Sequence, residues 1–485
     1  MFVEPGGRRL SFAEFKATCE RVAAGLQALG IDDQTPFSWQ LPTQIDTVVL
    51  SMALSRLGAI QNPIIALYRE REVGSLLDQT RAGWFAVLGE WRGFSYAEMA
   101  ATLSSRSAHP FRVLRVDEGL PEGDPSTLPP PPSNPELTRW LYSTSGTTSA
   151  PKVVQHTDGT LIAGGIGIAD SISPREGDIG SIVFPYAHIG GPDYLVMQLR
   201  YGMPALLLDI FAIPDSLETL RDNQVTITGG STAHYLMLLE EQRKSPNDPI
   251  LPRLQVLTGG GAPLASDTYY HVLEEVGGMI CHGYGMTESP MISNGKRTDT
   301  DEQRAETEGA PIPGIEILVV DGDERPVPRG VDGDVLVRGP MVAKGYLDPV
   351  ATQHAFREDG YFRTGDRGHL REDGQMVLTG RSKDMIIRKG ENIGPGEIEE
   401  LLMTHPKVAA VAVIGLPDAE RGERVCAVVE TPTGEEPLSF PELQQLCRTA
   451  QLMPQKVPEQ LEHVEMLPRN PTMKILKREL VAQFS

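Results

Sequence analysis

A hydroxyl-rich segment at residues 144–152 has the residue types needed to contact phosphate. It reads Thr-Ser-Gly-Thr-Thr-Ser-Ala-Pro-Lys. Its hydroxyl and backbone N–H groups can donate to phosphate oxygens, Gly146 allows close approach of the backbone, and Lys152 adds a positive charge. The lysine is not followed by Ser or Thr, so this is not the GxxxxGK[ST] loop. Alone, such a segment is more often an ordinary flexible loop, so its interpretation depends on what accompanies it.

A second segment, residues 282–288, reads His-Gly-Tyr-Gly-Met-Thr-Glu and places an aromatic ring, a hydroxyl and a carboxylate close together. Tyr284 can stack on a purine and Thr287 can reach a phosphate. Glu288 can hold Mg²⁺, which prefers oxygen ligands from carboxylates and phosphates. The combination favours a site for a nucleotide and a metal ion.

Two further segments supply a carboxylate and cations. Residues 361–366 read Tyr-Phe-Arg-Thr-Gly-Asp, and Asp366 suits a pair of ribose hydroxyls. Arg381 follows fifteen positions later and can share that task. The tail at residues 468–474 reads Pro-Arg-Asn-Pro-Thr-Met-Lys, and by itself its lysine is typical of a solvated turn.

The overall charge restricts the partners of the chain. The 485 residues carry a formal net charge of −21, which repels nucleic acid and anionic lipid. The same charge opposes binding of an anionic nucleotide. A nucleotide site therefore needs local backbone donors, a few placed cations and a metal ion, which is what the segments above offer.

The cysteines and the N-terminus favour a cytoplasmic protein. None of the four cysteines forms a CxxC pair, so we expect reduced thiols and no cysteine metal site. The first residues lack the charged and apolar regions of a signal peptide. The longest apolar stretch, residues 409–416, is too short for a membrane span. We expect no integral membrane part.

The elements that must position these segments are predicted from periodicity. Ser11 and Glu14 have the spacing of a capping box that opens a helix, and Gly30 ends it. Between residues 183 and 261, short apolar runs alternate with helical patterns. Such alternation predicts an α/β layered domain with a largely parallel sheet. Within it we expect strands at 205–208 and 254–258 and helices at 215–223 and 233–244.

The texture of the chain changes after residue 314. Two apolar runs at 315–320 and 334–338, separated by a turn-rich segment, predict a β-hairpin. Near residue 380 a second, smaller α+β unit begins. We expect an N-terminal domain at 1–380 and a mobile C-terminal domain at 381–485. The elements expected in the smaller unit are a helix at 397–403, a strand at 408–414 and a helix at 440–451.

In this order, the segments resemble the adenylate-forming superfamily of acyl-CoA synthetases, carrier-protein-loading adenylation domains and luciferases. The resemblance covers nearly the whole chain. It rests on the phosphate loop at 144–152, Tyr-Gly-Met-Thr-Glu at 284–288, Thr-Gly-Asp at 364–366, Gly-Arg-Ser-Lys-Asp at 380–384 and the terminal Lys474. It implies a reaction with ATP and Mg²⁺ that forms an acyl-adenylate, followed by transfer to a thiol.

The resemblance also implies a role for each matching residue. Tyr284 would stack on adenine, Glu288 would bind Mg²⁺, and Asp366 with Arg381 would hold the ribose. The implied ATP and AMP residues are Thr144, Ser145, Gly146, Thr147, Thr148, Lys152, Gly260, Gly261, Ala262, Gly283, Tyr284, Gly285, Met286, Thr287, Asp366 and Arg381. The implied catalytic residues are Lys474, His188, Thr287 and Glu288. Lys383 would be the hinge, and Lys389, Gly390 and Glu391 would approach coenzyme A.

Two positions depart from the family pattern. Ser149 and Met473 stand where the family usually has glycine. A left-handed backbone at either position would cost a residue with a side chain roughly 1 kcal/mol or more.

The segment around His188 predicts the kind of acid. Amino-acid-activating relatives usually carry an aspartate at the start of this region, where residues 184–187 of this chain read Phe-Pro-Tyr-Ala without a carboxylate, and Asp193 is off register. An α-amino acid is therefore disfavoured. The expected acyl pocket is rich in glycine, which favours a bulky apolar acid (fatty, alicyclic or aryl). Its residues are Ile189, Gly190, Gly191, Tyr194, Gly229, Gly230 and Ser231.

The acceptor is expected to be coenzyme A, because no carrier domain follows before Ser485. Three alternatives remain open at this point. They are a stand-alone enzyme that loads a carrier-protein thiol, a luciferase-like oxidative activity, and an inactive nucleotide-binding scaffold. A homodimer is compatible with each of them.

Overall fold

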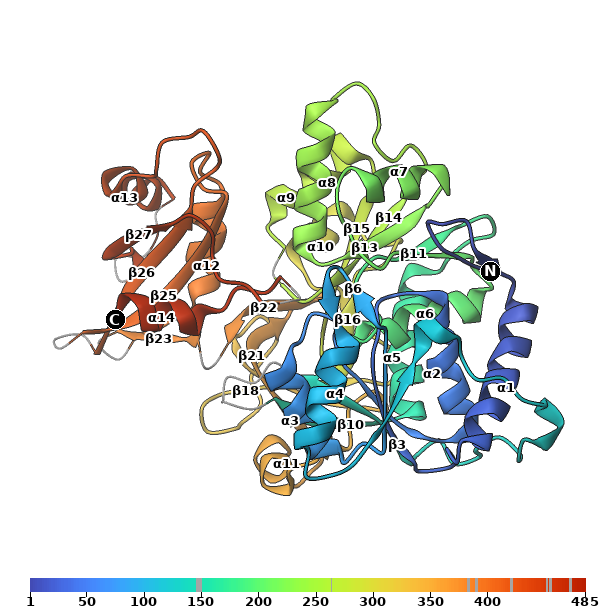
Figure 1. Ribbon diagram of the computed structural model, residues 1–485. Coiled ribbons are helices and arrows are strands. Elements are labelled where there is room, and N and C mark those ends of the chain that lie inside the picture. The colour runs from blue at the N-terminus through green and yellow to red at the C-terminus, as the bar shows by residue number, and fades with distance from the viewer. Residues whose placement is uncertain are drawn as a thin grey trace.

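The computed structural model describes residues 1–144, 151–262, 264–381, 384–388, 391–418, 422–450, 452, 456–470 and 473–485, with backbone only for Ile387, Glu391, Asn392 and Gly422. Four principal sheets and their helices form a large N-terminal region and a smaller C-terminal domain, which Figure 1 shows in orange and red at the left. The predicted α/β fold class is confirmed.

A nine-stranded sheet carries Gly260 and residues 283–286 of the predicted nucleotide site. Its order is β17-β16-β15-β14-β13-β11-β12-β1-β2. The pairs from β12 through β15 are parallel, as the alternating sequence pattern predicts, and β16 and β17 are antiparallel. The strands are β1 (Phe2–Val3), β2 (Arg9–Leu10), β11 (Gly180–Ile182), β12 (Ala205–Leu207), β13 (Ile227–Gly230), β14 (Val256–Gly260), β15 (Met279–Met286), β16 (Ser289–Asn294) and β17 (Ala310–Pro311).

A seven-stranded sheet carries the start and the end of the phosphate segment. Its order is β20-β10-β9-β4-β3-β5-β8. Its strands are β3 (Pro36–Gln40), β4 (Ile60–Pro63), β5 (Trp84–Val87), β8 (Arg112–Arg115), β9 (Thr138–Thr144), β10 (Lys152–Thr157) and β20 (Gly345–Tyr346). A small hairpin, β6 (Glu90–Trp91) and β7 (Phe94–Ser95), stands apart from it.

Helices cover both faces of the two sheets and also lie between them. One apolar core joins the inner faces of both sheets through α1 (Phe12–Ala28), α2 (Ile45–Leu57), α5 (Asp158–Ile172) and α6 (Gly190–Tyr201). The outer faces pack against α7 (Asp215–Asp222), α8 (Thr232–Lys244) and α9 (Ser266–His271) on one side, and against α3 (Glu70–Thr80) and α4 (Tyr96–Arg106) on the other. The capping box predicted at Ser11 and Glu14 is confirmed.

A four-stranded antiparallel sheet follows, and the predicted hairpin forms its first two strands. The four strands of the sheet are β18 (Glu316–Val320), β19 (Gly333–Arg338), β21 (Phe362–Leu370) and β22 (Met376–Arg381). The short helix α10 (Asp301–Glu306) precedes these strands in the chain, and α11 (Pro349–Ala355) lies between β19 and β21.

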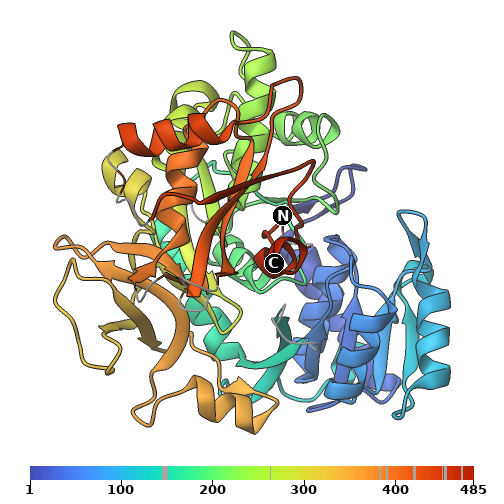
Figure 2. The same cartoon turned by 90° about the vertical axis from the view of Figure 1, so that its left-hand side faces the viewer.

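The C-terminal domain is built on a five-stranded sheet. Its strands are β23 (Ile386–Arg388), β24 (Glu391–Ile393), β25 (Ala410–Asp418), β26 (Gly422–Glu430) and β27 (Gln460–Val464). Its helices are α12 (Pro395–Met403), α13 (Phe440–Thr449) and α14 (Lys477–Phe484). The turned view brings this domain toward the viewer, in front of the N-terminal sheets (Figure 2). No helix in the described parts of the chain has the length and apolar character of a membrane span.

Candidate active site

Three predicted nucleotide residues, distant in sequence, meet at the edge between two sheets. Asp366 of β21 lies opposite Arg381 of β22, and Arg381 Nε is 3.1 Å from Asp366 Oδ1. The Tyr284 hydroxyl, at the end of β15, donates to Asp366 Oδ2 at 2.7 Å. Burial and the neighbouring carboxylate of Asp366 hold the pKa of Tyr284 well above its usual value, so its phenol remains a donor.

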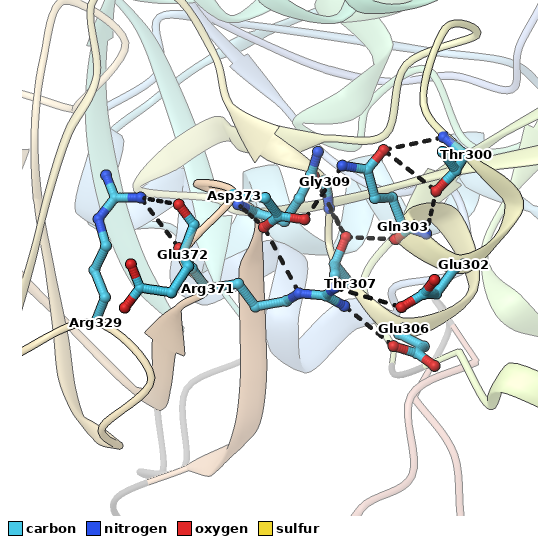
Figure 3. A network of polar contacts seen from close by, with 11 residues as sticks. Thr300, Glu302, Gln303, Glu306, Thr307, Gly309, Arg329, Arg371, Glu372 and Asp373 are labelled. Carbon is cyan, nitrogen blue, oxygen red and sulfur yellow. Dashed lines mark hydrogen bonds and ion pairs between the residues drawn. The ribbon is translucent and has the colours of Figure 1, made fainter.

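The hairpin that carries Asp366 is fixed at its far end. Figure 3 shows the Arg371 guanidinium reaching Glu302, Glu306 and Asp373, while Arg329 donates to the backbone of the same turn. The side chain of Gln303 in α10 donates to Asp373 at 3.2 Å. This network anchors the β21–β22 turn to α10, so the opposite end of the hairpin holds Asp366 against Tyr284.

The predicted metal ligand Glu288 is held by Tyr346, a residue that the sequence analysis did not identify. The Tyr346 hydroxyl donates to Glu288 Oε1 at 2.6 Å. The ring of Tyr346 also lies 5.1 Å from Lys152 Nζ, at the end of the phosphate segment. Tyr346 therefore connects two residues of the predicted phosphate and metal site.

The donor set fits Mg²⁺ shared with phosphates better than a cage made by protein alone. No group of three His, Cys, Asp or Glu among the described residues could hold a metal ion. Mg²⁺ commonly binds through one or two carboxylates together with substrate phosphates and water. The side chain of Glu288 is half-buried and supplies one such carboxylate. The backbone of Glu288 is also held in place, because its carbonyl oxygen accepts from Ala343 N at 2.8 Å.

Replacing Tyr346 with phenylalanine is expected to weaken the response to Mg²⁺ with little change in the fold. The hydrogen bond that orients Glu288 is lost, while the ring beside Lys152 remains. We expect a roughly 3- to 10-fold higher Mg²⁺ requirement for adenylation, in line with the net contribution of about 0.5–1.5 kcal/mol of a typical hydrogen bond. Mg²⁺ titration of pyrophosphate exchange measures this. Tyr361→Phe is the matched control, because its hydroxyl binds the surface Glu316; equal effects of both changes would contradict the role of Tyr346.

His156, in β10, supports Thr287 from behind. Its Nε2 is 2.7 Å from the Thr287 carbonyl oxygen. A carbonyl oxygen only accepts, so Nε2 carries the proton and Nδ1 faces the Thr160 hydroxyl at 2.9 Å. Burial lowers the pKa of His156 to about 4, which keeps the ring neutral at physiological pH. Nothing in the local sequence around His156 indicates this role.

His188 lies in the turn before α6, the helix that carries several residues predicted to line the acyl pocket. Its Nδ1 accepts from Gly190 N at 3.3 Å, and burial lowers the pKa of His188 to about 4. Tyr194 packs edge-on against Phe184 at 4.9 Å, and its hydroxyl donates to the Thr258 carbonyl at 2.7 Å. A neutral His188 can therefore act next to an acid without adding a positive charge.

Glycine is needed in this region for reasons that differ from position to position. A Cβ on Gly229 would lie 1.9 Å from the Thr258 carbonyl oxygen, and one on Gly191 would lie 2.1 Å from the Tyr186 carbonyl oxygen. These two glycines are required by backbone packing, not by open space for a bulky acid, which corrects the interpretation made from composition. At Gly230 the neighbour is the His234 ring, which in turn accepts from Ser231 N at 3.1 Å.

The segment 260–262, predicted to contact the nucleotide, packs against a buried pair of titratable groups, His282 and Glu308. His282 Nε2 lies 3.0 Å from the Ala262 carbonyl oxygen and 3.2 Å from Glu308 Oε2. Burial lowers the pKa of His282 to about 4. Burial, together with the charge of Asp366, raises the pKa of Glu308 to about 8. Both shifts favour a neutral pair at neutral pH.

Glu308→Gln is expected to change how stability depends on pH. The folded protein binds the Glu308 proton more tightly than the unfolded chain, so the wild type loses stability as pH rises from about 5 through about 8. Glutamine cannot ionise and has no such loss. The melting temperature of the variant minus that of the wild type should increase across this range, by about 2–4 °C. A constant difference in melting temperature between the variant and the wild type from pH 5 to 9 would contradict the assignment.

The predicted residues of the C-terminal domain lie on a different part of the fold. Lys474 N donates to Asn470 Oδ1 at 2.9 Å in the turn before α14. Met473 has φ +65°, a left-handed backbone that costs a residue with a side chain roughly 1 kcal/mol or more. Ser145, Gly146, Thr147, Thr148, Ser149, Lys383, Lys389 and Gly390, with the side chain of Glu391, lie outside the described residues.

Two protein-family models match successive parts of the chain. The model of the AMP-binding enzyme family matches residues 1–347. The chain belongs to this family. The model of the AMP-binding enzyme C-terminal domain matches residues 397–474 of this AMP-binding enzyme.

Individual relatives extend over nearly the full chain. The salicyl-AMP ligase / salicyl-S-ArCP synthetase of Mycobacterium tuberculosis is 30% identical over 99% of this chain and 86% of its own length. The 2-succinylbenzoate–CoA ligase of Geobacillus kaustophilus is 31% identical over 99% and 94%. The O-succinylbenzoate coenzyme A synthetase of Bacillus subtilis, solved with ATP and magnesium ion, has a TM-score of 0.86 at 26% identity over 99% and 96%.

This AMP-binding enzyme is therefore an AMP-forming acid–thiol ligase that activates a carboxylic acid as its adenylate. The superfamily predicted from the order of the motifs is confirmed. The roles predicted for individual residues remain predictions, including adenine stacking by Tyr284.

Proposed function

We propose that the enzyme joins a hydrophobic carboxylic acid (fatty, alicyclic or aryl) to coenzyme A in two steps. In the first, a carboxylate oxygen of the acid attacks the α-phosphorus of ATP and pyrophosphate leaves. In the second, the thiol of coenzyme A attacks the carbonyl carbon of the acyl-adenylate and AMP leaves. The convergence of Tyr284, Asp366 and Arg381 at one sheet edge is the observation that carries the proposal.

The residues of the chain divide the work of the first step. Asp366 accepts hydrogen bonds from the ribose hydroxyls while Arg381 holds its charge. The 144–152 segment donates to the phosphates, and His188 orients the acid without adding charge. Glu288 holds Mg²⁺, which when bound supplies positive charge against the phosphates. Lys474 neutralises charge that develops between the carboxylate and the α-phosphate.

The C-terminal domain supports a rotation between the steps. Lys474 comes shortly before α14 in the chain, whereas Glu391 begins β24 of the same domain. One orientation brings Lys474 to the nucleotide for adenylation, and rotation at Lys383 brings the Lys389 segment there for thiol transfer. A single domain thus serves two half-reactions.

Pyrophosphate exchange tests the first step and identifies the acid. We expect exchange with apolar acids and none with α-amino acids; exchange with amino acids only would overturn the proposed substrate class. Adding coenzyme A to an active mixture should then yield the thioester.

A carrier-protein thiol is the second candidate acceptor, because one relative is named as an S-ArCP synthetase. Product formation with a carrier protein but not with coenzyme A would favour it. A luciferase-like activity would emit light, and an inactive scaffold would bind ATP without exchange.

A further inference from the structure

Asp193, on α6, is a buried carboxyl group that the mechanism above does not use. It is 1% exposed, and neither of its carboxylate oxygens has a hydrogen-bond partner among the residues that the structure describes. Burial raises the pKa of Asp193 well above its usual value, so the group is neutral. An unpartnered buried polar group costs about 1–3 kcal/mol, and native proteins keep few of them. Its presence therefore requires an explanation.

The position of Asp193 places it next to the predicted acyl pocket. It lies one helical turn after Ile189, on the same face of α6, and directly before Tyr194. Ile189 packs with Trp140, Tyr142 and Leu161 in one apolar cluster. Asp193 therefore points from α6 toward α5 and β9, among otherwise apolar or aromatic side chains.

The carboxyl group packs closely against α5, at a glycine that lacks a side chain there. A Cβ on Gly164 of α5 would lie 2.9 Å from Asp193 Oδ1 and 3.1 Å from Pro290 Cβ. Pro290 belongs to β16 and comes two residues after Glu288, so the carboxyl group lies near the strand that follows the predicted metal ligand. The phenol groups of Tyr142 and Tyr194 lie close enough that an ionised Asp193 would raise the pKa of both.

We infer that Asp193 is a specificity-determining residue at the inner end of the acyl pocket, and that the acid activated by this enzyme carries a hydroxyl or amino group that donates a hydrogen bond to it. This inference rests on the proposed function and refines its substrate class. The body of the acid is apolar, matching Ile189 and Tyr142, and one polar group remote from the reacting carboxylate binds Asp193. A site built to bind such a group rejects an analogue that lacks it, because the buried carboxyl then stays unpartnered.

Gln198 offers a matched control on the same helix. Both atoms of its side-chain amide are also buried without a partner among the described residues. Its side chain lies toward β11, where a Cβ on Gly180 would be 3.7 Å from Nε2, and so on another side of α6. Truncating Gln198 reproduces the loss of a buried polar group without touching the predicted pocket.

The experiment compares pairs of acids that differ only in the donor group. Pyrophosphate exchange is measured for benzoic, hydroxybenzoic and aminobenzoic acids, and for alkyl acids with and without a terminal hydroxyl. We expect the wild type to favour the better donor-bearing member by about 10- to 100-fold in kcat/KM. Asp193→Ala should bring this ratio close to one, whereas Gln198→Ala should leave it unchanged. Asp193→Asn keeps the shape of the side chain and should give an intermediate ratio.

Each outcome decides between the inference and a purely structural role. A wild-type ratio near one for every pair, or equal changes in Asp193→Ala and Gln198→Ala, would overturn the inference and leave the proposed function standing. If Asp193→Ala does not fold, a wild-type ratio in Asp193→Asn would overturn it equally. Absence of exchange with every acid would overturn the proposed function, and the inference with it.

Discussion

Replacing Lys474 with alanine is expected to lower the rate of acyl-adenylate formation by about 10²- to 10³-fold, while ATP affinity changes little. A positioned cation at the developing negative charge stabilises the transition state more than the bound substrate, so its loss appears in kcat. Hydrogen bonds between Asn470 and Lys474 hold the backbone from which this side chain extends. Pyrophosphate exchange gives the rate, and equilibrium binding of ATP gives the affinity.

Lys477 provides the control for this change. It lies three residues away, at the start of α14, and its Nζ is 2.7 Å from Glu399 Oε1 within the same domain. Removing it takes away the same charge without touching the proposed reaction. Lys477→Ala should therefore retain exchange within a few-fold of the wild type. Equal losses in the two variants would point to general damage of the C-terminal domain and would count against the role given to Lys474.

Asp366→Asn is expected to raise the KM for ATP by about 10- to 100-fold with a smaller change in kcat. The asparagine amide carries no negative charge to pair with Arg381. It also has only one oxygen, so it cannot accept from both Arg381 and the Tyr284 hydroxyl as the two carboxylate oxygens do. Breaking a buried charge pair costs about 3–5 kcal/mol, but Arg381 is 33% exposed, so solvent screening puts the expected loss below that range. Initial rates over a range of ATP concentrations, at saturating acid, measure the effect.

An exposed ion pair in the same sheet separates nucleotide binding from sheet stability. Arg367 Nη1 is 3.4 Å from Asp334 Oδ1, and Asp334 is 39% exposed. Asp334→Asn should leave the KM for ATP within about two-fold, as expected for a surface pair. If Asp366→Asn leaves the KM for ATP equally unchanged, Asp366 does not hold the ribose.

The packing of the folded chain adds contacts to the predicted residues that their types alone do not reveal. The sequence shows Tyr284 as a ring able to stack on a purine. The fold adds a second role, since its hydroxyl donates to Asp366, 82 residues away. Likewise, glycine-rich composition suggested an open pocket, but Gly191 and Gly229 have backbone atoms where their side chains would stand.

The sequence by itself determined the family, the α/β layers and the order of the site segments. These depend on short patterns, such as the capping box at Ser11 or the Thr-Gly-Asp motif ending at Asp366, whose physical causes act within a few residues.

Only the tertiary structure decided which residues support the site. Tyr346 reaches Glu288 across 58 residues, and His156 reaches the Thr287 carbonyl across 131. Glu308 and Asp193 are ordinary acids in the sequence, and their neutrality follows from desolvation by neighbours on other elements. Local pattern contains no information about such neighbours, because strand pairing and helix packing choose them.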